Sequence, residues 1–188
     1  MTTFNLFVTP LKIINLINYE QINEKINECC RLTFENNFNE KLPKEEKESI
    51  EKIFRDEAEL YLKELTNKKI DLYLSKSWVS YTNKYGFNTP HDHSDNIVIG
   101  VYYINVPEFS GDLLLHDPRG AHSFISQFEL NASGQLVSGR SYYRVKPKTG
   151  SLVLFPSYIV HSVEPNMSDE TRRSLAINFR YKNFNQFK

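Results

Sequence analysis

Apolar residues recur at helical spacing in the first third of the chain. Asn18 suits an N-cap, and Gln21 three residues later completes a capping box. Pro43 suits the first turn of a second helix. The two apolar stripes comprise Ile22, Ile26, Cys29, Cys30 and Phe34 in the first segment, and Ile50, Ile53, Phe54, Ala58, Tyr61 and Leu65 in the second. This spacing predicts two amphipathic helices with charged outer faces.

The pattern changes to alternation after Asn67. Residues 70–81 alternate between two apolar sets, which is typical of a β-strand. Further strands are expected at 97–106, from Leu113 onward, and at 142–145, 152–155 and 174–181, with one more at 4–11 that ends at Pro10. The polar segment 121–139 predicts a long loop over the mouth of a barrel.

Two helices followed by many short strands predict an α+β domain. The β part is expected to form a jelly roll, with the helices packed on one outer face. No repeat or long linker divides the sequence, so residues 1–188 are expected to form a single domain. Residues 1–67 would supply helical support and residues 68–188 the jelly-roll core.

Charge and cysteine content indicate which partners and which cellular compartment are expected. Lys plus Arg and Asp plus Glu both number 23, so no overall basic field attracts nucleic acid, and a nucleic-acid partner is disfavoured. No signal peptide or apolar run of membrane-spanning length is present. The adjacent Cys29 and Cys30 are poorly placed to form a disulfide with each other, which favours a reducing compartment and a cytoplasmic location.

A histidine pair, His91 and His93, precedes the apolar run at 97–106. In an extended segment both side chains point to one face, and Asp95 shares that face. His161 follows a second apolar run, at residues 150–157. Two imidazoles with a third donor nearby suit iron, zinc, nickel or copper. The alternative is that the pair is solvated in a surface loop.

A series of short motifs resembles the Fe(II)- and 2-oxoglutarate-dependent oxygenases. The resemblance is to the prolyl hydroxylase-like branch, and within it to uncharacterised oxygenases of bacteria and phages. It covers residues 78–181 and is carried by His91-Asp92-His93, Gly100-Val101-Tyr102-Tyr103, Ser110-Gly111, Asp117-Pro118-Arg119, the segment from Lys148 to Ser157, the segment from His161 to Pro165, and the segment from Arg172 to Phe179. It implies a double-stranded β-helix, or cupin-like jelly roll, that holds iron between two strands.

This resemblance also implies a set of metal ligands, with one departure. The family usually supplies His-x-Asp or His-x-Glu and a distal His, whereas His93 occupies the carboxylate position here. We expect His91, His93 and His161 to bind the metal. Asp95 is the alternative third ligand, either with His91 or as a His-x-Asp pair with His93.

Further residues are assigned by the same resemblance. Arg172 would bind the distal carboxylate of 2-oxoglutarate, and Tyr103 and Tyr81 would place hydroxyls near this cosubstrate. Arg173 would point to the opposite face of its strand. Substrate contacts are expected from three residues near the barrel mouth, namely Asp117, Arg119 and His122.

The implied activity is that of a hydroxylase. Fe(II), 2-oxoglutarate and O2 would be used to hydroxylate a small-molecule or peptide substrate, with release of succinate and CO2. One alternative is a jelly-roll binding or phage structural module without catalytic activity. Another is a three-His metalloenzyme of the cupin type that does not use 2-oxoglutarate.

Overall fold

The computed structural model describes residues 8–32, 44–119 and 142–182, which form two helices and nine strands. The helices are α1 (Tyr19–Leu32) and α2 (Lys44–Thr66). The strands are β1 (Lys12–Asn15), β2 (Leu72–Thr82), β3 (Asn88–His91), β4 (Val98–Asn105), β5 (Leu113–His116), β6 (Tyr142–Val145), β7 (Ser151–Pro156), β8 (His161–Val163) and β9 (Arg172–Tyr181). No helix in these ranges is long and apolar enough to cross a membrane.

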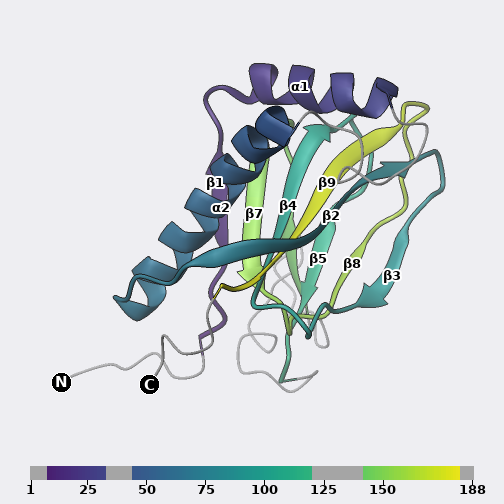
Figure 1. Ribbon diagram of the computed structural model, residues 1–188. Helices are drawn as coiled ribbons and strands as arrows, with labels where there is room; N and C mark the ends of the chain where they lie inside the picture. Colours follow the sequence, from purple (N-terminus) through teal and green to yellow (C-terminus); the bar gives the residue numbers. More distant parts are fainter. Residues whose placement is uncertain (1–7, 33–43, 120–141, 183–188) are drawn as a thin grey trace.

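The strands form two antiparallel sheets that face each other (Figure 1). The larger sheet has the order β1-β7-β4-β9-β2, and the smaller has the order β3-β8-β5-β6. Both sheets combine strands that are distant in sequence. The long β9, for example, pairs with β4 on one side and β2 on the other.

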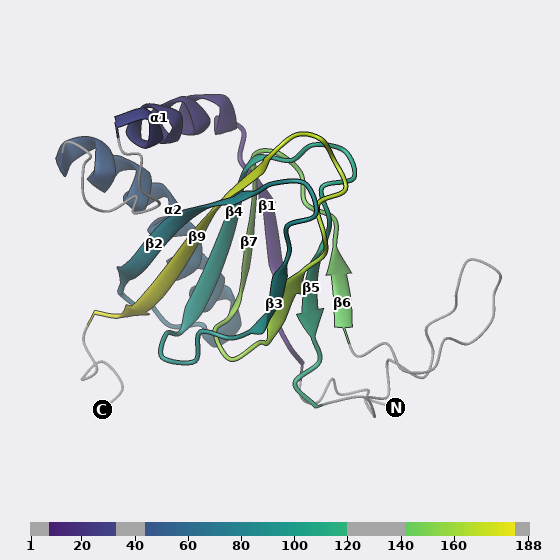
Figure 2. The same cartoon turned by 90° about the vertical axis from the view of Figure 1, so that its right-hand side faces the viewer.

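Both helices lie against the outer face of the larger sheet (Figure 2). Ile26 of α1 and Phe54 of α2 are buried in one cluster with strand residues such as Tyr102 and Leu175. The Phe54 and Tyr102 rings lie 5.1 Å apart. The residues of β4 that point toward the helices therefore belong to a first core, which lies between the helices and the larger sheet.

The second core lies between the sheets. Ile99 and Tyr103 from β4 and Phe155 from β7 meet Leu113 and Leu115 from β5. On β4 this face alternates with the helix-packing face, as strand geometry requires. The same alternation along β9 turns Arg172, and then every second residue, toward the inside of the barrel.

The observed elements agree with most of the predicted ones, and the differences concern strands. The first described strand begins at Lys12, after Pro10, so the prediction of a strand ending at Pro10 is wrong for residues 8–11. Proline lacks the N–H needed for the strand ladder, which favours a start beyond it. Strands β3 and β8, which begin at Asn88 and His161, are absent from the predicted set. The predicted loop at 121–139 lies outside the described residues.

Candidate metal centre

Three histidines meet where strands β3 and β8 run side by side. His91 is the last residue of β3 and pairs in register with His161, the first residue of β8. His93 lies two residues beyond the end of β3. Each of the three offers one nitrogen, and these nitrogens lie within 4.8 Å of one another. Three donors at this spacing can surround a single metal ion.

Backbone carbonyls orient two of the three rings. Nδ1 of His91 lies 2.7 Å from the carbonyl oxygen of Thr89, and Nδ1 of His161 lies 3.0 Å from that of Ile159. A carbonyl oxygen only accepts, so each Nδ1 must carry the hydrogen and donate it. The Nε2 lone pair of each ring is then free, which is the arrangement that metal-bound histidines commonly adopt.

A tight turn holds His93 in place beside the other two histidines. Its N–H donates to the carbonyl of Ser157 at 3.1 Å, and its own carbonyl accepts from the N–H of Asn96 at 2.9 Å. The hydroxyl of Ser157 donates to the carbonyl of Asn96 at 2.7 Å. The edge of the Trp78 ring lies against the imidazole, with centroids 5.7 Å apart. These contacts fix the turn from both β7 and β2.

The surroundings favour neutral imidazoles. Burial, together with the nearby His91 and His93, lowers the pKa of His161 to about 4, against a smaller upward effect of its bond to Ile159. Burial, followed by His91, also lowers the pKa of His93. Neutral imidazoles have a lone pair available at neutral pH, so a metal would displace no proton from these two rings.

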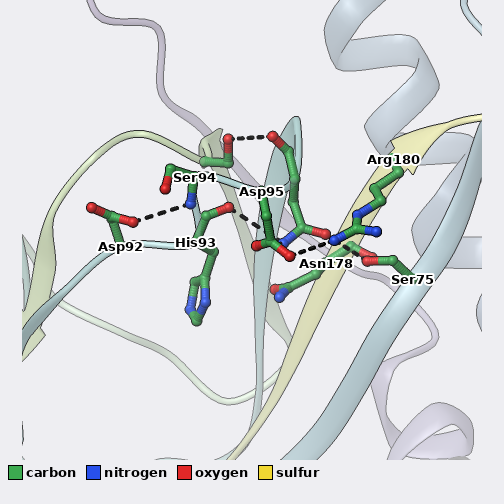
Figure 3. A network of polar contacts seen from close by, with 9 residues as sticks. Ser75, Asp92, His93, Ser94, Asp95, Asn178 and Arg180 are labelled. Carbon is green, nitrogen blue, oxygen red and sulfur yellow. Dashed lines mark hydrogen bonds and ion pairs between the residues drawn. The ribbon is translucent and has the colours of Figure 1, made fainter. Parts of the chain in front are cut away.

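The neighbouring carboxylates point elsewhere (Figure 3). Asp95 forms an ion pair with Arg180 of β9 and accepts a hydrogen bond from Asn96 at 2.8 Å. Asp92 accepts from the N–H of Ser94 at 3.1 Å. Within the described part of the chain, neither carboxylate belongs to the group of potential ligands around the histidines. The structure thus brings together His91, His93 and His161, and it places Asp95 outside that group.

Arg172 lies inside the barrel at the start of β9, and only 2% of its surface is exposed. Its Nη1 donates to the carbonyls of Ser110 and Gly111, both at 3.2 Å. Its Nη2 donates to the hydroxyl of Thr82 at 3.3 Å. Its Nε has no hydrogen-bond partner among the described residues. Burial lowers the pKa of this guanidinium, and Tyr103 and Asp112 act in the opposite direction. A buried cation that lacks a full set of partners is a suitable site for an anion.

The two tyrosines predicted to contact the cosubstrate lie on different sides of the larger sheet. Tyr103 is buried within the barrel, close enough to Arg172 to affect its pKa. Tyr81 pairs with Arg173, whereas the adjacent Thr82 pairs with Arg172 and contacts it. Tyr81 therefore lies on the opposite face of β2 from Thr82, and 45% of its surface is exposed. The structure does not bring Tyr81 to Arg172, and Thr82 stands there in its place.

The residues predicted to contact substrate lie at the edge of the described chain. Asp117 and Arg119 form a two-bond ion pair with each other, at 3.0 and 2.8 Å. His122 lies outside the described residues. His116, on β5, is within hydrogen-bond distance of the Ser162 hydroxyl, at 2.9 Å, and is not part of the histidine cluster. The ion pair of Asp117 and Arg119 lies just beyond the end of β5.

Residues 76–178, which are more than half of the chain, match the family described as "Putative 2OG-Fe(II) oxygenase". The chain belongs to this family. This confirms the superfamily predicted from the sequence and agrees with the predicted cofactors Fe(II) and 2-oxoglutarate. The match includes all three histidines and Arg172. A search of the curated proteins found no match.

Solved structures of 2OG-Fe(II) oxygenases share the fold. A prolyl-4-hydroxylase from Pseudomonas putida is 19% identical, with a TM-score of 0.61 over 95% of this chain and 91% of that one. HygX from Streptomyces hygroscopicus with iron bound is 12% identical, with a TM-score of 0.62 over 94% and 84%. A second HygX structure holds nickel and 2-oxoglutarate, and it is 10% identical at a TM-score of 0.61 over the same shares.

An oxidoreductase of the 2OG-Fe(II) oxygenase family from Burkholderia pseudomallei is also similar. It is 14% identical, with a TM-score of 0.54 over 74% of this chain. The match covers only 59% of the length of that protein. Together these structures identify the pair of antiparallel sheets as the jelly roll that was predicted.

Proposed function

We propose that the protein is an Fe(II)- and 2-oxoglutarate-dependent dioxygenase that hydroxylates a small-molecule or peptide substrate. The observation that carries the proposal is the buried guanidinium of Arg172, which has no ion pair to a carboxylate in the described part of the chain. A buried cation is costly unless an anion compensates it. The distal carboxylate of 2-oxoglutarate would supply that anion.

The histidine cluster fits the metal by its donor chemistry. Imidazole nitrogens suit iron, and three of them leave positions open for a chelating ligand and for O2. The family usually has two histidines and one carboxylate, so a three-histidine site gives the iron one negative charge less. We propose that His91, His93 and His161 are the ligands, with Asp95 held by Arg180.

Arg172 fits the cosubstrate by its remaining hydrogen-bonding capacity. Two backbone carbonyls and the Thr82 hydroxyl fix the plane of the guanidinium, and Nε is left to donate. A guanidinium in a fixed orientation binds a carboxylate more specifically than an ammonium does. Tyr103 is buried beside it and would cover the bound cosubstrate from the β4 side.

When bound, iron and 2-oxoglutarate supply the oxidative chemistry, in which 2-oxoglutarate and O2 give succinate and CO2 and one oxygen atom enters a substrate C–H bond. The chain itself performs three tasks. Arg172 orients the cosubstrate from its far end, the histidine rings are held by Thr89 and Ile159, and the apolar core around Phe155 excludes water behind the metal. Phe155 lies 5.0 Å from the His161 ring, between centroids.

Arg172 also separates this function from its two alternatives. A three-His metalloenzyme that does not use 2-oxoglutarate has no need for a buried arginine with a free donor. A binding module without catalytic activity has no need for three histidines whose ligand nitrogens lie within 4.8 Å of one another. The presence of both features in one barrel favours the oxygenase.

Turnover of 2-oxoglutarate tests the proposal. The purified protein with Fe(II), ascorbate and O2 should convert 2-oxoglutarate to succinate at a slow, substrate-independent rate. His161→Ala should bind no iron and form no succinate. His116→Ala is the matched control, because that histidine lies outside the cluster, and it should keep the wild-type rate. Succinate formation that persists in His161→Ala would contradict the assignment of His161 as a metal ligand of an oxygenase.

A further inference from the structure

A lysine of β2 lies beside the histidine cluster without an anionic partner. Nζ of Lys76 stands over the ring of Trp78, 5.3 Å from its centroid, and the edge of the Trp78 ring lies against His93. Burial and His91 lower the pKa of His93 most, and the charge of Lys76 adds a smaller effect in the same direction. The ammonium is therefore near the cluster. In the described part of the chain, Lys76 forms no ion pair.

Asn178 of β9 lies directly opposite Lys76 in the larger sheet. Only 3% of its surface is exposed, and its Oδ1 has no hydrogen-bond partner among the described residues. Its neighbours Ile177 and Phe179 pack under the helices, so the Asn178 side chain faces the inside of the barrel. Figure 3 shows its amide extending from β9 toward the side on which His93 lies. A buried amide without a partner destabilises the folded state, and a ligand that completes its hydrogen bonds would remove that cost.

The positions next to this pair are open to solvent. Trp78 pairs with Ala176, which is two residues before Asn178 on β9. Both Trp78 and Ala176 are partly exposed although they face the inside of the barrel, so a solute can reach this part of the sheet. The guanidinium of Arg180, the next inward-facing residue of β9, is already paired with Asp95. The lysine is thus the cation that still lacks an anion here.

The chemistry of Lys76 and Asn178 indicates an acidic ligand. An ammonium donates hydrogen bonds and accepts none, and the NH₂ of a carboxamide also donates. A carboxylate accepts several hydrogen bonds and carries the opposite charge. Side chains that are directly opposite on antiparallel strands have Cβ atoms about 5 Å apart, so one carboxylate can contact both residues. The Trp78 ring offers an apolar surface to the carbon skeleton of the same ligand.

We propose that Lys76 and Asn178 are substrate-binding residues that hold a carboxylate of the compound to be hydroxylated. The inference rests on the proposed function, because it takes the histidine cluster as the place where that compound reacts. The substrate class is then an organic acid, and a small molecule and the C-terminal end of a peptide share this chemistry. Arg172, the residue proposed for the distal carboxylate of 2-oxoglutarate, is six positions before Asn178, about 20 Å along an extended strand. The two carboxylates would therefore occupy separate positions.

The fluorescence of Trp78 tests the proposal, because this is the only tryptophan of the chain. The anaerobic protein is first saturated with Fe(II) and 2-oxoglutarate, so that the cosubstrate position is filled. The probes are free L-amino acids and N-acetylated tripeptides, each titrated beside its primary amide, and the series that binds more tightly distinguishes a small acid from a peptide end. In wild type, at least one acid should bind about tenfold more tightly than its amide. Equal affinities of acid and amide throughout both series would overturn the inference.

Variants assign the preference to the two residues. Lys76→Met should weaken acid binding by about tenfold and leave amide binding unchanged. Asn178→Leu should also weaken acid binding, and its ligand-free melting temperature should equal or exceed that of wild type because an unsatisfied amide is removed. An undiminished preference for acids in Lys76→Met would overturn the inference. A lowered melting temperature of Asn178→Leu with unchanged acid binding would show that the amide is structural, which also overturns it.

Lys84→Met is the matched control. Nζ of Lys84 also stands over an aromatic ring, 5.4 Å from the centroid of Tyr85. It forms an ion pair with Asp169 at 2.6 Å, however, and it lies beyond the other end of β2. This variant should keep the wild-type affinity for acids. A loss as large as that of Lys76→Met would show a general effect of surface charge and overturn the inference.

The outcomes separate this inference from the proposed function. The visible charge-transfer band of the iron chelate reports 2-oxoglutarate binding independently of Trp78 fluorescence. Iron binding without a band in wild type would contradict the proposed function, whereas a preference for acids that depends on Lys76 in that same protein would still support the carboxylate site. A normal band together with equal affinities for acids and amides would overturn the inference alone.

Discussion

At the scale of single residues, the metal centre depends on which nitrogen of each imidazole is free. Thr89 and Ile159 accept from Nδ1 of His91 and His161, so the Nε2 atoms face the centre. His93 is set by its backbone and by Trp78. Its neighbour Asp95, with 71% of its side chain exposed, is engaged by Arg180. The two candidates for the third metal ligand are therefore the half-buried imidazole of His93 and the exposed carboxylate of Asp95.

Paired variants test this choice. We expect His93→Ala to weaken Fe(II) binding by at least about 100-fold, because a metal site with two ligands in place of three loses most of its affinity. Asp95→Ala should change the affinity by less than about threefold, since an exposed ion pair contributes little. Anaerobic competition with a chromogenic chelator measures both affinities. The opposite ranking of the two variants would make Asp95 the ligand.

Single residues also show how far the sequence can predict the site. The resemblance at His91, His93, His161 and Arg172 nominated three histidines whose ligand nitrogens lie within 4.8 Å of one another and an arginine that is buried in the structure. The sequence does not show whether Tyr81 or Thr82 faces Arg172. Alternation along a strand defines two faces, but it does not show which face points into the barrel.

At the scale of elements, the turn before β5 connects the carbonyls that hold Arg172 to the end of β8. Gly111 has a φ of +85°, and a Cβ atom there would lie 2.3 Å from the carbonyl oxygen of Glu164. Backbone atoms cannot move aside as a side chain can. The glycine thus allows β5 to begin next to β8 and aims the carbonyls of residues 110 and 111 at the guanidinium.

We expect Gly111→Ala to lower the free energy of unfolding by about 2 kcal/mol or more, from the positive φ and the clash with Glu164. The same variant should weaken 2-oxoglutarate binding, because Arg172 loses its fixed carbonyl partners. Gly100→Ala is the control. Its Cβ would meet a side-chain atom of Leu154 at 3.2 Å, which can shift, so its cost should be smaller. Urea unfolding of both variants measures the difference, and equal costs would contradict this account.

The helices are a second element-scale feature. Ile26 of α1 is completely buried against the larger sheet, whereas Ile17, just before that helix, is fully exposed. Ile26→Ala should lower the free energy of unfolding by about 2–5 kcal/mol, and Ile17→Ala should change it little. Below the unfolding transition, iron affinity should be the same in both variants because α1 packs on the face opposite the histidines. A specific loss of iron binding in folded Ile26→Ala would show that α1 acts on the site.

At the scale of the whole molecule, the histidine cluster and Arg172 both border the core between the two sheets. The histidines gather where β3 ends and β8 begins, and Arg172 stands at the start of β9 beside the turn into β5. This core includes Tyr103, which is close enough to Arg172 to affect its pKa, and Phe155, whose ring lies 5.0 Å from that of His161. The succession of two helices and many short strands predicted this class of fold. The order of strands in the two sheets could not be predicted in this way, because it depends on pairing between distant segments.

The proposed function requires that one barrel binds iron through its histidines and 2-oxoglutarate through Arg172. Anaerobic titration of the Fe(II)-loaded protein with 2-oxoglutarate tests it most directly, because the chelate gives a weak visible charge-transfer band. We expect the band in wild type and in Arg173→Ala, whose guanidinium contacts Asn27 on the helix side. Arg172→Ala should need at least about 100-fold more 2-oxoglutarate. Iron binding without any band in wild type, or an unchanged titration in Arg172→Ala, would contradict the account.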